Sequence, residues 1–244
     1  MKTLSVITVT YNAEETLERT LISVGEQSWE HIEHIIVDGN SKDDTMKLIK
    51  KYDNDKMHWI SEPDKGLYDA MNKAVAMAAG DYLCFLNAGD TFYSAITVEE
   101  MMRSIPQGNM PDIIYGQTAI VDNNGTFLYM RRLKTPEVLT RNSFKQGMLV
   151  CHQAFIVNRN LFEPYSLDYR FSSDFDWAVR MLDKAKNIHN THLTLINYLN
   201  EGLTTANHKA SLKERYRIMT KHFGQISTAL HHLWFVVRRM GNRK

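Results

Sequence analysis

Residues 4–12 read LSVITVTYN, an apolar and β-branched run that ends in the polar pair Tyr11 and Asn12. Such a run predicts a buried strand. The apolar side chains between positions 17 and 24 then recur at helical spacing. The chain therefore begins with a strand, a loop and a helix, and the prediction of the fold extends from this unit.

The same unit returns along the first ninety residues. The runs IIVD at 35–38, MHWIS at 57–61 and YLCFL at 82–86 predict three further strands. Helical apolar patterns over 45–52 and 67–78 separate them. Four strands that alternate with three helices predict a doubly wound, mainly parallel α/β sheet.

After this half the pattern changes. Residues 112–121 and 125–131 flank the turn sequence NNG at 123–125, which is typical of a hairpin. A strand over 153–157, a helix from Asp174 and a strand over 192–198 follow. We therefore expect a mixed sheet in one body that continues to about residue 205, and then a helical tail over 206–244.

Composition describes the body and the tail separately. The 244 residues are 43% apolar and carry 29 basic against 28 acidic groups, which excludes disordered, collagen-like and coiled-coil proteins. Residues 207–244 hold nine basic residues and one acidic residue, so the body is acidic. We expect the body to suit metal or cationic groups and the tail to meet an anionic surface.

The tail segment 226–239 mixes aromatic and aliphatic residues with flanking charge. Two interpretations stay open: a helix that lies on a membrane surface, and a helix that packs on the body or on a second subunit. Nucleic acid is a weak alternative, because no binding motif accompanies the charge. Two isolated cysteines and the absence of an export signal favour the cytoplasm, with peripheral contact to the inner face of the cell membrane.

In sheets of this kind, ligands bind beyond the carboxyl ends of the strands. The chain has neither a G-x-G-x-x-G turn nor a Walker loop, which weakens dehydrogenase and kinase interpretations. The polar residues at the predicted strand ends should lie close together; they are Thr10, Tyr11, Asn12, Asp38, Glu62, Asp64, Asn87 and Asp90.

Each of these side chains also has a local interpretation. Asn12 with Glu15 fits a capping box, and Ser41 fits the cap of the next helix. Asp90 suits Mg²⁺ or Mn²⁺, but a loop aspartate is the simpler interpretation. At the start of a helix, Asp174 suits either a general base or a helix cap.

Four motifs together carry a resemblance: VITVTYN at 6–12, VDGNS at 37–41, SEPDKGLYDAMNK at 61–73 and AGDYLCFLNAGD at 79–90. In this order they resemble the family-two glycosyltransferases of the GT-A (Rossmann-like) fold, and within that family the small bacterial enzymes that build surface polysaccharides. The resemblance is close over about the first hundred residues. His152, Gln153 and residues 174–180 extend it more loosely.

The resemblance implies a role for each matching residue. It implies that Thr10, Tyr11, Asn12 and Asp38 bind the nucleoside and that Asp64 belongs to the donor pocket. It implies that Asp90 ligates the metal and that Asp174 is the catalytic base. Asn87, His152 and Asp176 would contact the substrate, and Asp176 is also the alternative base. The nucleotide-binding half is then about 1–110 and the acceptor-binding half about 111–205.

By the same resemblance, the enzyme transfers a sugar with inversion from a nucleoside-diphosphate sugar to a hydroxyl of a glycan or a lipid-diphosphate-linked sugar. A uridine nucleotide is favoured, with guanosine and thymidine nucleotides open. The segment Asn87-Ala88-Gly89-Asp90 has one aspartate where the family commonly has two or more, so dependence on a divalent metal is open. The sequence also leaves open whether the protein forms a homo-oligomer. Two alternative functions remain: a nucleotidyltransferase, and a non-catalytic nucleotide-sugar-binding or scaffold subunit.

Overall fold

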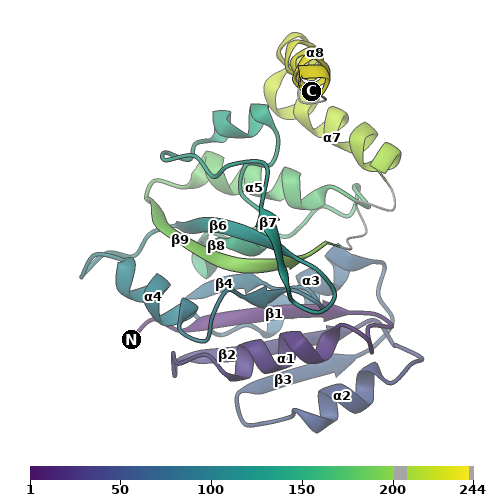
Figure 1. The fold of residues 1–244 in the computed structure, drawn as a ribbon, viewed down its shortest axis with the longest axis vertical. Helices are drawn as coiled ribbons and strands as arrows, with labels where there is room; N and C mark the ends of the chain where they lie inside the picture. The colour runs from purple at the N-terminus through teal and green to yellow at the C-terminus, as the bar shows by residue number, and fades with distance from the viewer. Residues whose placement is uncertain (201–207, 242–244) are drawn as a thin grey trace.

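The computed structural model describes residues 1–200 and 208–241, and it describes the side chains of residues 1–200 and 209–235. The predicted boundary near residue 205 lies outside the described residues. Within them, one sheet of nine strands forms the centre, in the order β3-β2-β1-β4-β8-β6-β9-β5, with β7 paired to β6. Figure 1 shows helices on the faces of this sheet and α7 and α8 at one end of the molecule.

The first half confirms the predicted repeating unit. It runs β1 (Leu4–Thr10), α1 (Leu17–Gly25), β2 (Ile32–Asp38), α2 (Thr45–Lys51), β3 (Met57–Ser61), α3 (Leu67–Met77) and β4 (Tyr82–Phe85). The four strands pair in parallel. Their carboxyl ends therefore meet at one edge of the sheet.

The second half is mixed, as the changed pattern predicts. It runs β5 (Thr91–Phe92), α4 (Thr97–Ser104), β6 (Ile113–Val121), β7 (Phe127–Met130), the 3-10 turns η1 (Arg141–Gln146) and η2 (His152–Ala154), β8 (Phe155–Asn158), η3 (Arg159–Leu161), α5 (Ser173–Lys184) and β9 (Ile188–Leu199). The hairpin β6–β7 is antiparallel, whereas β6 pairs in parallel with β9. The strand expected from Gln153 begins two residues later, because His152–Ala154 forms η2.

The local capping predictions are wrong. Helix α1 begins at Leu17 with Thr16 as its N-cap residue, and α2 begins at Thr45; neither has a side-chain cap bond. Asn12 instead takes a left-handed backbone conformation with φ of 49°. Because its side chain binds another loop, it is not free to cap its own helix.

Apolar faces of the helices complete the core. Trp177 of α5 is fully buried and meets the ring of Phe85 at 5.5 Å and that of Phe155 at 5.6 Å. The tail consists of α7 (His208–Phe223) and α8 (Gln225–Gly241), and Ile218 and Met219 of α7 belong to the same buried core. Among the described residues, no helix has the length and apolar character that crossing a bilayer requires.

Candidate active site

Three strand ends form the first part of the site. Thr10, Asp38 and Ser61 lie side by side at the ends of β1, β2 and β3. The fully buried Asp38 accepts hydrogen bonds at Oδ2 from the Ser61 hydroxyl, at 2.6 Å, and from the backbone N–H of Ser41, at 3.0 Å. The Ser41 hydroxyl donates to Asp38 Oδ1. Asp38 therefore fixes the loop that follows β2.

The loops after these strands touch one another at Gly39. A methyl group added to Gly39 would lie 2.6 Å from Asp64 Oδ2 and 3.3 Å from Tyr11 Cδ2, so a larger residue here would displace the Asp64 side chain. Asn12 Oδ1 accepts a hydrogen bond of 2.9 Å from the backbone N–H of Lys42. Tyr11 remains 63% exposed, and Thr10 Oγ1 is a buried polar atom without a partner among the described residues. The structure thus gathers the predicted nucleoside-binding residues in one place.

A second polar cluster follows the end of β4. Asn87 Nδ2 lies 3.3 Å from His152 Nε2, and His152 Nδ1 lies 3.5 Å from Asp174 Oδ2. On its other oxygen, Asp174 accepts a hydrogen bond of 3.1 Å from the Tyr68 hydroxyl. This cluster joins the turn after β4 to η2, α5 and α3, so the fold assembles it from four segments that are distant in sequence.

The environment of Asp174 favours its ionised form. Burial opposes ionisation, but the hydrogen bond and charge of His152, the charge of Arg215 and the backbone N–H of Phe175 outweigh it, so the pKa of Asp174 lies below its usual value. The Asp174 side chain is 19% exposed. It is therefore a carboxylate at neutral pH with part of its surface open to solvent.

Tyr68 stays a hydrogen-bond donor. Burial and the negative charge of Asp174 raise the pKa of Tyr68 well above its ordinary value. Its protonated hydroxyl therefore holds the carboxylate of Asp174 in one orientation, as His152 does from the other side.

Asp90 lies at the turn after Asn87 and is 3% exposed. Its two oxygens accept hydrogen bonds from Gln153 Nε2, at 2.7 Å, and from the backbone N–H of Leu199, at 2.9 Å. Burial raises the pKa of Asp90 to about 6 against the opposing effect of these donors. The structure thus fixes the orientation of this carboxylate.

The donor set fits a cation that shares its ligands with a substrate. Among the described residues, no group of three or more His, Cys, Asp or Glu side chains is placed to hold a metal ion. However, Asn87 Oδ1 is buried without a partner, and each oxygen of Asp90 keeps a second lone pair. Mg²⁺ commonly binds proteins through one or two carboxylates and takes other ligands from phosphates and water.

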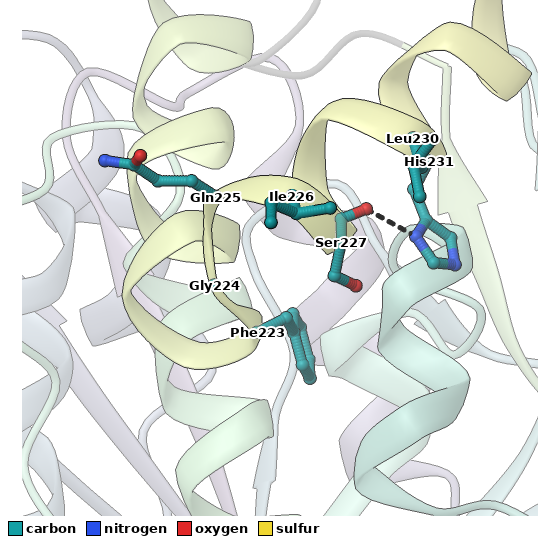
Figure 2. A pocket seen from close by; sticks show the side chains of 7 residues that line it. All are labelled: Phe223, Gly224, Gln225, Ile226, Ser227, Leu230 and His231. Carbon is teal, nitrogen blue, oxygen red and sulfur yellow. Dashed lines mark hydrogen bonds between the residues drawn. The ribbon is translucent and has the colours of Figure 1, made fainter.

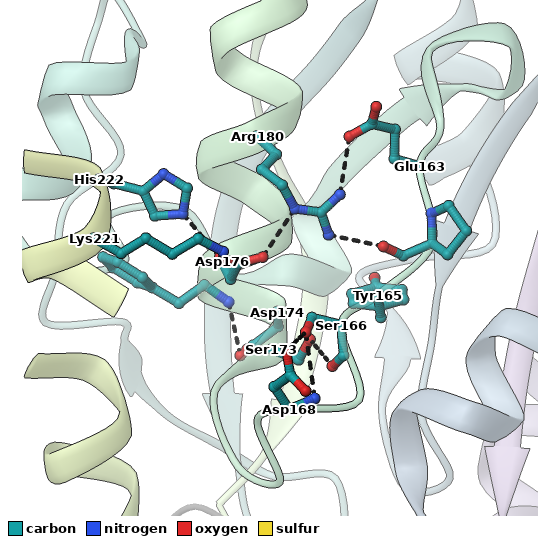
Figure 3. Close-up of polar contacts among 12 residues, drawn as sticks. Glu163, Tyr165, Ser166, Asp168, Ser173, Asp174, Asp176, Arg180, Lys221 and His222 are labelled. Atoms are coloured by element: carbon teal, nitrogen blue, oxygen red, sulfur yellow. Dashed lines mark hydrogen bonds and ion pairs between the residues drawn. The ribbon is translucent and has the colours of Figure 1, made fainter. Parts of the chain in front are cut away.

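Asp176 lies apart from this cluster, although it follows Asp174 by two residues. Positions two apart in a helix point to nearly opposite faces. Asp176 accepts from Arg180 Nε at 2.8 Å and from His222 Nε2 at 2.8 Å, and Lys221 Nζ is 3.3 Å away (Figure 3). Despite the cost of burial, these partners lower the pKa of Asp176 to about 2. The contacts of Asp176 thus join α5 to the tail.

Sequence reasoning gave no role to two residues that complete the site. Tyr68 stands inside the motif at 61–73, and Gln153 follows His152 directly, so both were visible as neighbours of candidate residues. Their contacts with Asp174 and Asp90 depend on segments far apart in the chain. Only the folded structure reveals them.

The parallel α/β half, the joined strand-end loops and the partly exposed carboxylate on α5 define an enzyme of the GT-A glycosyltransferase class. The family model Glycosyl transferase family 2 matches residues 5–165. The chain belongs to glycosyltransferase family 2 and is a glycosyltransferase.

Two related proteins are also glycosyltransferases by name. A PGL/p-HBAD biosynthesis glycosyltransferase of Mycobacterium bovis is 32% identical over 186 residues, which cover 72% of this chain and 68% of that protein. The Escherichia coli enzyme WfgD, named as a UDP-Glc:alpha-D-GlcNAc-diphosphoundecaprenol beta-1,3-glucosyltransferase, is 25% identical over 70% of this chain and 66% of its own length.

Solved structures share the fold. S. aureus TarS (residues 1–349) in complex with UDP-GlcNAc superposes with a TM-score of 0.74 at 20% identity, over 94% of this chain and 66% of that one. The mannosyltransferase PcManGT of Pyrobaculum calidifontis, in complex with GDP-Man and Mn²⁺, superposes with a TM-score of 0.67 at 14% identity. The match covers 95% of this chain and 70% of that one. The predicted GT-A fold is confirmed.

Proposed function

We propose that this enzyme transfers a sugar, with inversion, from a nucleoside-diphosphate sugar to a hydroxyl of a glycan or lipid-diphosphate-linked acceptor in bacterial surface-polysaccharide synthesis. The observation that carries the proposal is Asp174, a carboxylate that is ionised, partly exposed and oriented by His152 and Tyr68. The names of WfgD and of the mycobacterial relative support a role in glycan assembly.

The chemistry needs one base at the acceptor. Asp174 accepts the proton of the acceptor hydroxyl while the oxygen attacks the anomeric carbon. The bond from that carbon to the diphosphate oxygen breaks on the opposite face, and the nucleoside diphosphate leaves with the electron pair. Contacts from His152 and Tyr68 keep the carboxylate oriented towards the acceptor hydroxyl.

The donor binds at the strand ends. The orphan Thr10 Oγ1 and the exposed ring of Tyr11 offer contacts to a nucleoside, together with Asn12, Asp38 and Asp64. A uridine nucleotide is favoured, because WfgD is named for UDP-Glc and TarS was crystallised with UDP-GlcNAc.

Asp90 would hold a divalent cation, with Asn87 Oδ1 as a further oxygen ligand. Such an ion, when bound, neutralises charge on the departing diphosphate. Gln153 and the backbone N–H of Leu199 orient the carboxylate for this role. The complex of PcManGT with Mn²⁺ supports the use of a divalent cation.

Calorimetric titration tests the donor site directly. Uridine, guanosine and thymidine diphosphates are titrated in turn with Mn²⁺, with Mg²⁺ and with chelator, and we expect metal-supported binding of the uridine nucleotide. Nuclear magnetic resonance of the product then gives its anomeric configuration. Failure of every nucleotide to bind would overturn the proposed donor, and a product of retained configuration would overturn inversion.

A further inference from the structure

Large apolar side chains lie exposed along one face of α8. Ile226, Leu230 and Leu233 expose 81%, 62% and 63% of their surfaces. Their spacing of four and three residues places them on a single stripe. Helices of globular proteins turn such a stripe towards the core, whereas here it faces outward.

The opposite face of α8 is already occupied. Thr228 is fully buried, and the His232 ring meets Tyr216 of α7 at 5.0 Å. Phe235 packs against the His232 ring at 5.4 Å and against the main core. The packing of α8 on its own protein thus leaves the stripe uncovered among the described residues.

A hollow of about 720 Å³ opens at the start of the stripe, where α7 turns into α8. Figure 2 shows Ile226, Leu230 and Phe223 among the side chains that line it. The guanidinium of Arg141 lies 5.0 Å from the Phe223 ring centre, and Lys145 Nζ lies 5.7 Å from it. The apolar hollow therefore has cations beside it.

The neighbouring helix α7 carries further exposed cations. Lys209, Lys213 and Arg217 of α7 are exposed, and none of the three has an ion-pair partner within the described ranges. In sequence, four more basic residues follow position 237, namely Arg238, Arg239, Arg243 and Lys244. The helix pair thus combines an exposed apolar stripe with uncompensated positive charge.

We propose that α7 and α8 dock this enzyme on the surface of an anionic phospholipid bilayer. Ile226, Leu230 and Leu233 enter the boundary between headgroups and acyl chains, and the basic residues meet the lipid phosphates. A second copy of the chain fits the same stripe less well. A two-fold interface would bring two strongly cationic tails together, and their repulsion would oppose it.

Sedimentation with vesicles tests this proposal without any sugar substrate, so its outcome is independent of the proposed reaction. The full chain is mixed with phosphatidylcholine vesicles that contain or lack phosphatidylglycerol. We expect binding to the anionic vesicles that weakens as salt rises. The double variant I226D/L230E should bind about tenfold or more weakly, because it removes apolar insertion and adds negative charge.

The variant V138D is the matched control, because Val138 is 73% exposed and lies outside the tail. It should bind as the unchanged chain does. Ile226 lies in the first turn of α8, where an aspartate suits the helix dipole, and circular dichroism checks that the helix persists. A second variant, K213E/R217E, should bind anionic vesicles more weakly than the unchanged chain, and the difference should be largest at low salt.

Three results would overturn the proposal. The first is no binding of the unchanged chain to anionic vesicles, and the second is equal binding by the folded I226D/L230E variant. The third is a dimer, seen by light scattering without lipid, that I226D/L230E abolishes while vesicle binding persists; the stripe would then belong to a second copy.

Discussion

His152 Nδ1 lies 3.5 Å from Asp174 Oδ2, and the imidazole also reaches Asn87 through its other nitrogen, at 3.3 Å. One histidine thus connects the turn after β4, which carries the proposed cation ligands, with the helix that carries the proposed base. In the proposed reaction, the acceptor site and the leaving-group site therefore share contacts with one side chain.

Replacement of Asp174 by asparagine should reduce transfer by about a hundredfold or more, because the amide cannot accept the acceptor proton. Nucleotide binding should stay nearly unchanged. The rate of nucleoside-diphosphate release and a nucleotide titration measure the two effects. Asp183→Asn is the control, since Asp183 is on the same helix, 66% exposed and paired with Arg141. Retained turnover in Asp174→Asn would reject the base assignment.

Replacement of His152 by alanine should move the acid limb of the kcat/KM profile to higher pH. Burial raises the pKa of Asp174 and His152 opposes it, so loss of the histidine lets that pKa rise. His152→Asn, which keeps an N–H donor, should shift the profile less. If the alanine variant had an unchanged acid limb, His152 would not orient or polarise Asp174.

Asp90→Asn should remove the metal-dependent part of nucleotide binding and leave the metal-independent part. The amide keeps the size of the carboxylate but not its charge, and it can still accept a hydrogen bond from Leu199. Titration with Mn²⁺ and with chelator separates the two parts. Equal metal dependence in the variant and the unchanged protein would place the cation elsewhere.

Asp176 should stabilise the fold above about pH 4 and lose this effect as the pH falls towards 2. Its pKa is about 2 in the folded protein and near 3.8 in the unfolded chain, which corresponds to about 2 kcal/mol. In urea unfolding at pH 6, Asp176→Asn should therefore have a lower free energy of unfolding than the unchanged protein, and this deficit should shrink as the pH falls. A deficit that stays constant down to pH 2 would contradict this account.

The sequence predicted the elements of the fold because apolar runs such as that of β1 depend on local periodicity. It also predicted that the strand ends would gather. It did not predict the local role of Asn12, whose backbone conformation and bond to Lys42 arise from packing of two loops. For the same reason the partners of Asp176 were invisible, since His222 reaches it from the tail.

The attachment of α7 has a consequence for how the molecule unfolds. Ile218 and Met219 of α7 are buried in the core beside the sheet. Asp176 accepts hydrogen bonds from Arg180 on its own helix and from His222 on α7. A chain cut before α7 would keep the contact of Asp176 with Arg180 but lose its contacts with Lys221 and His222, and the core would lose the side chains of Ile218 and Met219. The tail therefore packs into the same core as the body, and we expect its exchange for another segment to weaken the helix that carries Asp174.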